Sequence, residues 1–120
     1  MPSYDDAHDE PRATPAAGTV TALEPQKKNA NRLSVFIDGV FSFGIEQDVL
    51  LDHPIARGSE LGEEAIRRIL EDDARLRARR FTIAYLARRA RTEHEVRDAL
   101  RQRDFAGEVV DHAIERLKNL

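Results

Sequence analysis

The side chains in this sequence with the clearest chemical potential are arginines. The stretch LARRARTEHEV, residues 86–96, places Arg88, Arg89 and Arg91 within four positions and then turns acidic. A guanidinium presents a planar fork of N–H donors that binds phosphate or carboxylate in two-point contact, whereas a lysine is a point charge. These residue types predict recognition of an anionic partner, either a nucleic acid or an acidic protein.

The arginines extend well beyond this stretch. Residues 74–103 hold ten arginines and no lysine against Glu93, Glu95 and Asp98, a net charge of +7 in a chain whose formal net charge is −3. Such a density of one sign is typical of a surface for a polyanion or an acidic protein. The alternative is a solvated helix end whose arginines pair with neighbouring acids or bond helix-terminal carbonyls.

We predict a partner-binding surface made of arginines from this segment and of three cations that flank a polar loop earlier in the chain. Its candidate residues are Arg88, Arg89, Arg91, Arg97, Arg101, Arg103, Lys27, Lys28 and Arg32. For the three loop cations, solubility of the loop is the simpler interpretation.

The other potentially reactive side chains do not form a recognisable constellation in the sequence. The four histidines have no histidine partner at helical spacing, so no metal site is predicted. The carboxylates of residues 63–73 fall at predicted helix ends, no serine adjoins a histidine, and no glycine-rich phosphate loop is present. We therefore expect no catalysis, no metal and no cofactor.

Composition limits the class of protein further. A chain of 120 residues is long enough for one compact domain, or for a small domain beside a helical module. It has no cysteine and no apolar run near the roughly 20 residues that span a membrane, and residues 1–18 lack the basic start and apolar stretch of a secretory signal. We expect a monomeric cytoplasmic protein without a membrane partner.

The elements that must position the cations begin with strands. Residues 1–17 are acidic, rich in Pro and Ala and without periodicity, and predict a disordered tail. Residues 18–58 predict a β-hairpin element with a short helix before Pro54. Within it, Leu33, Val35 and Ile37 alternate before Asp38-Gly39, and Phe41, Phe43 and Ile45 alternate after it, which indicates a type I′ hairpin turn in a three-stranded antiparallel sheet.

Helical periodicity then continues from residue 59 to residue 120. Apolar stripes are expected at Leu61, Ala65, Ile66, Ile69 and Leu70, and at Leu76, Ile83, Leu86, Ala87 and Ala90. Thr92 and Glu95 have the spacing of a capping box that starts a new helix at about residue 93, and RDFAG separates it from a last amphipathic helix. The fold class predicted is α+β, mostly α: a small N-terminal antiparallel sheet or hairpin followed by a three-helix repeat module. Because no capping Gly or Asn is expected after Leu117, the chain is expected to be truncated at residue 120.

Two segments resemble one known family, the RecX family of recombination regulators. The first is the hairpin stretch TALEPQKKNANRLSVFIDGVFSFG, residues 21–44. The second resembles the first helical repeat of that family through Leu86, Arg89, Arg91, Thr92, Glu95, Val96, Leu100, Phe105, Val110, Ile114 and Leu117. The chain departs from the family in holding one such repeat where members usually carry three, and in having Ala106-Gly107 where a better N-cap is usual.

The resemblance implies a non-enzymatic regulator of DNA repair, recombination and the SOS response. It implies that the chain binds RecA on DNA, lies in the groove of the nucleoprotein filament, and damps RecA ATPase and strand exchange, with direct contact to single- or double-stranded DNA as an extension. The alternative from the residues alone is a small helix-turn-helix DNA-binding protein, which requires base-edge donors such as Asn or Gln on its recognition helix.

Overall fold

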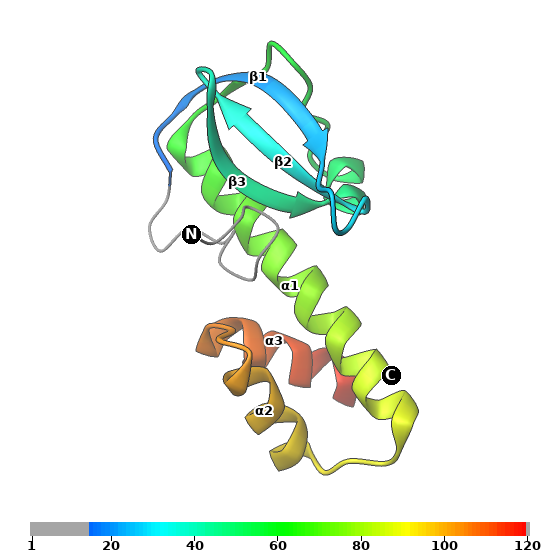
Figure 1. The fold of residues 1–120 in the computed structure, drawn as a ribbon. Coiled ribbons are helices and arrows are strands. Elements are labelled where there is room, and N and C mark those ends of the chain that lie inside the picture. The colour runs from blue at the N-terminus through cyan, green and yellow to red at the C-terminus, as the bar shows by residue number, and fades with distance from the viewer. Residues whose placement is uncertain (1–14, 120) are drawn as a thin grey trace. The chain divides into compact units, whose positions relative to one another are not determined.

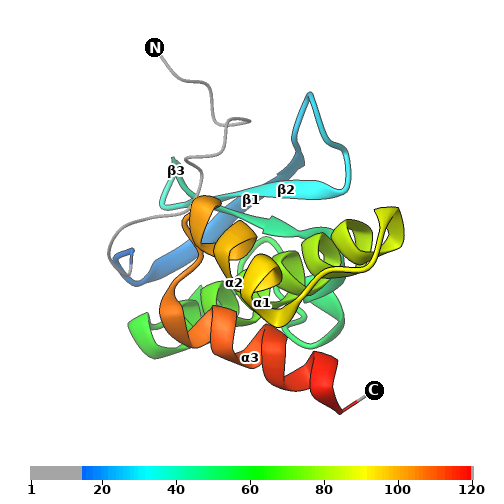
Figure 2. The ribbon, with the colours of Figure 1, turned by 90° about the horizontal axis from the view of Figure 1, so that it is seen from below.

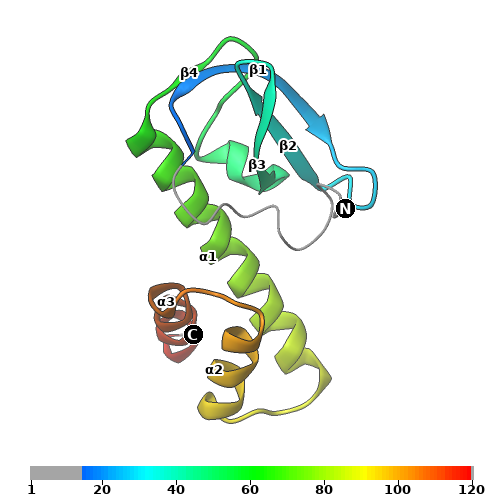
Figure 3. The same cartoon turned by 60° about the vertical axis from the view of Figure 1, so that its left-hand side comes forward.

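The first structured part of the chain is a curled antiparallel sheet. The computed structural model describes residues 15–119, and its four strands follow the order β3-β2-β1-β4, of which Figure 1 labels β1, β2 and β3. The strand bounds are Gly18–Pro25 for β1, Arg32–Ile37 for β2, Val40–Glu46 for β3 and Glu60–Leu61 for β4. The sequence predicts three strands; the fourth, β4, is a two-residue strand that pairs with β1 at Gly18 and Thr19 (Figure 3).

The turn between β2 and β3 is the tight hairpin that the sequence predicts. Asp38 and Gly39 have φ values of 52° and 85°, so both central residues adopt the positive φ that a type I′ turn requires. Two residues of strand β1 form hydrogen bonds with this turn. The Asp38 carboxylate accepts the Thr19 N–H at 3.1 Å, and the Thr21 hydroxyl accepts the Gly39 N–H at 3.0 Å.

The core of the sheet contains the residues that alternation predicts. Leu33, Val35 and Ile37 of β2 are buried, as are Phe43 and Ile45 of β3. Phe41 is only half-buried and meets the ring of Phe36 edge-on at 6.0 Å between centroids. Further buried apolar residues of this unit are Val20, Val49, Leu61, Ile66 and Ile69.

A short 3-10 helix, η1 (Gln47–Leu51), follows β3, in agreement with the short helix expected before Pro54. The long helix α1 (Glu63–Arg88) comes next. The chain divides into two compact units, residues 1–73 and 74–120, and the boundary between them falls inside α1. The start of α1 belongs to the sheet unit because Asp73 accepts the backbone N–H of Glu46 at 2.7 Å.

The second unit consists of the last part of α1, α2 (Glu93–Gln102) and α3 (Gly107–Lys118), seen together in Figure 2. The capping box is present as predicted: the Thr92 hydroxyl accepts the Glu95 N–H, and the Glu95 carboxylate accepts the Thr92 N–H. The core of this unit is formed by Ala74, Ala78, Val96, Leu100, Val109, Val110, Ala113 and Ile114, with Phe81, Tyr85, Leu86 and Phe105 packed against it.

Two details of the helical predictions were wrong. Ala65, Ala87 and Ala90 are exposed, and Ile83 is 55% exposed, because the buried stripe of α1 instead follows the small residues Ala74 and Ala78 and the rings beyond them. In addition, α3 does have a capping residue, since Asn119 is its C-cap. The expected lack of a C-cap therefore gives no ground for a truncated chain.

The disordered tail predicted for residues 1–17 lies outside the described residues except for its last three positions. Within the described residues, no helix combines the length and apolar character needed to cross a bilayer.

Candidate functional site

The cations that the sequence singles out lie in both units, and each unit is described by itself. In the sheet unit, Lys27 and Lys28 are exposed in the loop between β1 and β2. Arg32, the first residue of β2, is buried, with only 11% of its side chain exposed. The three loop cations therefore separate into two exposed lysines and one arginine that is removed from solvent.

The side chain of Arg32 is paired with carboxylates inside the sheet unit. Its guanidinium lies 3.2 Å from the carboxylate of Glu46, which is its cross-strand partner in β3, and 3.6 Å from that of Asp73 in α1. A buried cation must be paired in this way, because an unpaired charge in a low-dielectric interior is very costly. We therefore assign Arg32 to the interior of the sheet unit and leave it out of the binding surface.

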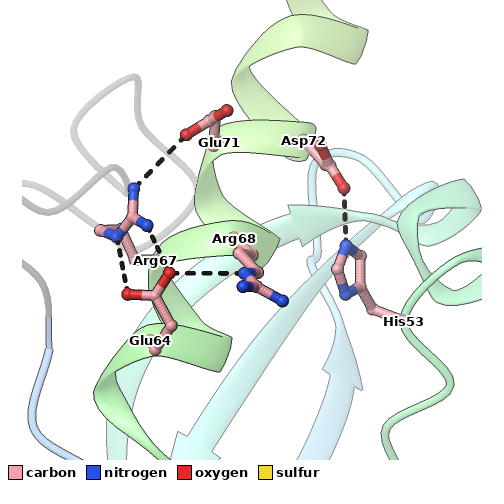
Figure 4. Close-up of polar contacts among 6 residues, drawn as sticks. All are labelled: His53, Glu64, Arg67, Arg68, Glu71 and Asp72. Carbon is pink, nitrogen blue, oxygen red and sulfur yellow. Dashed lines mark hydrogen bonds and ion pairs between the residues drawn. The ribbon is translucent and has the colours of Figure 1, made fainter.

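The first turns of α1 carry charges that are paired within the sheet unit (Figure 4). Arg67 contacts Glu64 and Glu71, and Arg68 contacts Glu64 at 3.4 Å. The hydrogen bond from the Arg67 side chain is the main cause that lowers the pKa of Glu64 below its usual value. On the same helix Asp72 lies 2.7 Å from the Nε2 of His53. Because residues 63–73 hold five carboxylates against only Arg67 and Arg68, this helix start has a net negative charge and is a poor candidate for an anion site.

The remaining six candidates all lie in the helical unit. Arg88 is the last residue of α1, and Arg89 and Arg91 belong to the segment that joins α1 to α2. Arg97 and Arg101 are on α2, one helical turn apart, and Arg103 is its C-cap. The end of α1, the connection that follows it, and α2 with its C-cap therefore carry the whole set.

Two of these arginines are held by aromatic rings. The rings of Phe81 and Tyr85, one turn apart on α1, stack with centroids 5.4 Å apart and planes at 18°. The guanidinium carbon of Arg103 lies 4.3 Å from the Phe81 centroid and that of Arg91 lies 4.0 Å from the Tyr85 centroid. We call this set, Arg103, Phe81, Tyr85 and Arg91, the aromatic column. Cation–π contacts of this kind fix a guanidinium in place without neutralising it.

Arg97 is tied to another helix by ion pairs. Its guanidinium lies 2.6 Å from the carboxylate of Asp111 on α3 and 3.8 Å from that of Glu93 on α2, and 24% of its side chain is exposed. Lys118 of α3 also pairs with Glu93, at 3.0 Å. Arg97 therefore helps to join α2 to α3, which corresponds to the structural alternative that the sequence left open.

The most accessible guanidinium groups are those of Arg88, Arg89 and Arg101. Arg88 is exposed, and no carboxylate within residues 15–119 forms an ion pair with it. Arg89 pairs with Glu95 at 3.1 Å and Arg101 approaches Asp98 at 3.9 Å, but their side chains are 59% and 60% exposed. Ion pairs this exposed contribute little, so a phosphate or an external carboxylate can replace the internal acid at small cost.

Glu95 connects this surface to the fold. Its carboxylate accepts the backbone N–H of Thr92, and this bond is the largest cause that holds the pKa of Glu95 below 4.5; the side chain of Arg89 lowers it further. The same carboxylate thus caps α2 and orients one of the exposed arginines. Sequence reasoning found the cap but missed the contact to Arg89.

Sequence reasoning also missed the aromatic column. The only local signal is the four-residue spacing of Phe81 and Tyr85, which places two rings on one helix face. The partners Arg91 and Arg103 come from the next connection and the next helix, and a pattern along the chain does not reveal them. Among residues 15–119, no group of three or more metal-ligating side chains is assembled.

The described residues thus define a class of molecule: a small antiparallel sheet unit followed by a three-helix unit that presents outward guanidinium groups. Two family models match the chain, "Regulatory protein RecX N-terminal domain" over residues 18–62 and "RecX, first three-helix domain" over residues 78–117. The chain belongs to the RecX family and carries the N-terminal region and first three-helix domain of that family.

Individual relatives agree with this assignment. The chain is 31% identical over 101 residues to regulatory protein RecX of Clostridium perfringens, a match that covers 84% of this chain and 48% of the relative. The same identity over 101 residues relates it to regulatory protein RecX of Levilactobacillus brevis, of which 38% is covered. A crystal structure of regulatory protein RecX superposes with a TM-score of 0.65 at 27% identity, covering 86% of this chain and 50% of that one. The chain spans about half the length, or less, of these relatives.

Proposed function

We propose that this chain is a non-enzymatic regulator that binds the RecA recombinase and its nucleoprotein filament on DNA in the cytoplasm. Binding lowers the DNA-stimulated ATPase activity of RecA and its strand exchange during DNA repair and recombination. The chain acts by occupying a surface of the filament, as a monomer, and transforms no molecule.

The observation that supports this proposal most directly is the outward set of arginines in a chain of the RecX family. Arg88, Arg89 and Arg101 present guanidinium groups that internal acids hold weakly or not at all. A filament offers DNA phosphates and carboxylates of the protein, and bidentate contacts to both suit arginine. Arg91 and Arg103, fixed by the aromatic column, add positive charge of defined position, and Lys27 and Lys28 are the candidates from the sheet unit.

The test measures ATP hydrolysis by RecA on single-stranded DNA while the concentration of this chain is raised. We expect the rate of ATP hydrolysis to fall as this chain is added. The double variant Arg88→Glu, Arg89→Glu should need at least about tenfold more protein for the same inhibition, equivalent to roughly 1.4 kcal/mol of lost binding free energy.

Arg57→Glu is the matched control, because Arg57 is an exposed arginine of the sheet unit outside the candidate set. It should inhibit like the unmodified chain. Unchanged ATPase at saturating protein would count against the proposal, and equal loss in the control would assign the effect to net charge alone.

A second candidate function, a helix-turn-helix DNA-binding protein, is favoured by one observation: α2 and α3 are joined by a short turn over residues 103–106. Its α3 helix, however, offers no Asn or Gln before Asn119, so base-edge readout lacks its usual donors. Binding to duplex DNA that depends on base sequence in the absence of RecA would favour this candidate.

A further inference from the structure

A second surface of the helical unit has a different character from the arginine surface. A hollow with a volume of about 90 Å³ lies between α1 and α3, lined by Arg79, Thr82, Ile83, Ala113, Arg116 and Leu117. A space of this size holds several water molecules and therefore also one apolar side chain. None of its lining residues belongs to the connection between α1 and α2.

The apolar part of this hollow is left open by the fold. Ile83 is 55% exposed and Leu117 is half-buried, whereas Ala113 beneath them is buried. Each large aliphatic side chain that is withdrawn from water contributes roughly 1.5–3 kcal/mol. An isoleucine that remains in water beside a hollow is therefore a favourable contact for an apolar group from elsewhere.

The polar part of the hollow has one sign of charge. Arg79 and Arg116 come from different helices, both are exposed, and no carboxylate within residues 15–119 pairs with either. Arg97 of the same unit differs from them, because its guanidinium is paired with the carboxylate of Asp111. Thr82, which also lines the hollow, is buried and its hydroxyl has no hydrogen-bond partner among the described residues.

We propose that this hollow is a docking site for an acidic protein segment that inserts one large apolar side chain between Ile83 and Leu117. Carboxylates on either side of that side chain pair with Arg79 and Arg116. The aliphatic floor distinguishes this occupant from a nucleic acid, which supplies negative charge but no long aliphatic group. The site is independent of the arginines at the connection between α1 and α2.

The experiment follows the methyl resonances of Ile83, Ala113 and Leu117 by NMR while a probe peptide is added to the intact chain. The probe has a central leucine with two glutamates on each side and blocked ends. We expect saturable shifts at these methyl groups with a Kd on the order of 1 mM, as befits one side chain and two ion pairs. Replacing the probe leucine with serine should weaken binding by about tenfold, and replacing its glutamates with lysines should abolish saturation.

Two variants place the binding at the hollow. Ile83→Asp puts a carboxylate on the floor of the hollow and should abolish the response of Leu117. Ala84→Asp adds the same charge at the next exposed position of α1 and should leave it intact.

Several results would overturn the proposal. They are an absence of saturable shifts with the leucine probe, an equal response to the serine probe, and an equal loss in both variants. A stronger response of the same methyl groups to oligothymidylate would make the hollow a nucleic-acid site. Shifts that depend on protein concentration without peptide would make a second copy of the chain its occupant.

Discussion

The arginines of this chain differ in what holds each guanidinium. Arg32 is buried between Glu46 and Asp73, and Arg91 and Arg103 lie on aromatic rings, whereas Arg88 is exposed without an acidic neighbour in the described part of the chain. The same residue type therefore occurs as an interior ion, as a surface charge held on an aromatic ring, and as an exposed side chain without an acidic partner among the described residues. Burial and partners decide the role, and the total charge of a segment does not.

Arg32 provides a test of this distinction. Replacing it by methionine keeps much of the side-chain volume but removes the guanidinium that pairs with Glu46 and Asp73. We expect the free energy of unfolding to fall by about 3 kcal/mol, since a buried pair that loses one partner is strongly destabilised. Urea denaturation measures this value. A loss below about 1 kcal/mol, as is usual for exposed pairs, would mean that Arg32 is not an interior ion.

Glu95 gives the surface a dependence on pH. Because the hydrogen bond from the Thr92 N–H, together with Arg89, lowers the folded-state pKa of Glu95 below 4.5, the ionised carboxylate favours the folded state. Its contribution is complete above the unfolded-state pKa and is lost as the pH falls through the folded-state pKa. The variant Glu95→Gln should be less stable than the unmodified chain at neutral pH, and the difference should shrink as the pH falls through the lowered folded-state pKa of Glu95. Thermal unfolding across this range checks it, and curves that stay parallel would contradict it.

At the scale of the element, the predictions that succeeded were those with a local cause. The hairpin turn follows from Asp38-Gly39, which tolerate positive φ, and the start of α2 follows from Thr92 and Glu95, which cap it within one turn. Strand β4 was missed because two residues carry no alternation, and its pairing with β1 depends on a distant segment.

The stripe of α1 was misplaced for a different reason. Its early residues Ile66 and Ile69 are buried in the sheet unit, while Ala74 and Ala78 are buried in the helical unit, so no single stripe continues along it. The candidate site was predictable only as a set of cations. Arg97 pairs with Asp111, which lies 14 positions further along the chain, and Arg103 lies over the ring of Phe81 on another helix. Spacing along the chain does not predict such pairs.

The start of α3 offers a prediction for a whole element. Its N-cap, Ala106, has extended backbone with φ −62° and ψ 150° but no side-chain acceptor for the first N–H groups of the helix. The variant Ala106→Asp supplies that acceptor and a favourable charge at the positive helix end, so the unfolding free energy should rise by about 1 kcal/mol. Chemical denaturation measures the gain. Ala106→Asn is the matched variant that supplies the acceptor without the charge, and no gain in either variant would contradict the prediction.

At the scale of the whole molecule, the net charge conceals an uneven distribution. Residues 74–120 contain twelve Lys or Arg and seven Asp or Glu, whereas residues 1–73 contain seven and fifteen, although the chain as a whole carries −3. A protein of sequence pI about 5.8 therefore includes a unit of net positive charge. Its behaviour toward polyanions depends on that unit more than on the total.

We accordingly expect the chain to bind single-stranded DNA at low ionic strength and to release it as salt is added. For single strands, the logarithm of the binding constant falls by about 0.7 for each phosphate contact per tenfold rise in salt. Arg88→Gln should reduce that slope by roughly this amount, whereas Arg57→Gln should leave it unchanged. Fluorescence anisotropy with labelled oligothymidylate gives the slopes, and binding insensitive to salt would exclude phosphate contact.

The stacked rings of α1 also give the helical unit an optical signal of its own. The chain has no tryptophan, and Tyr85 is the one tyrosine within residues 15–119, its ring held between Phe81 and Arg91. A ring fixed in an asymmetric environment produces near-ultraviolet circular dichroism, which disappears when tertiary packing is lost. The contribution of Tyr85 to this band therefore reports the packing of the helical unit, and a far-ultraviolet scan beside it records secondary structure from both units.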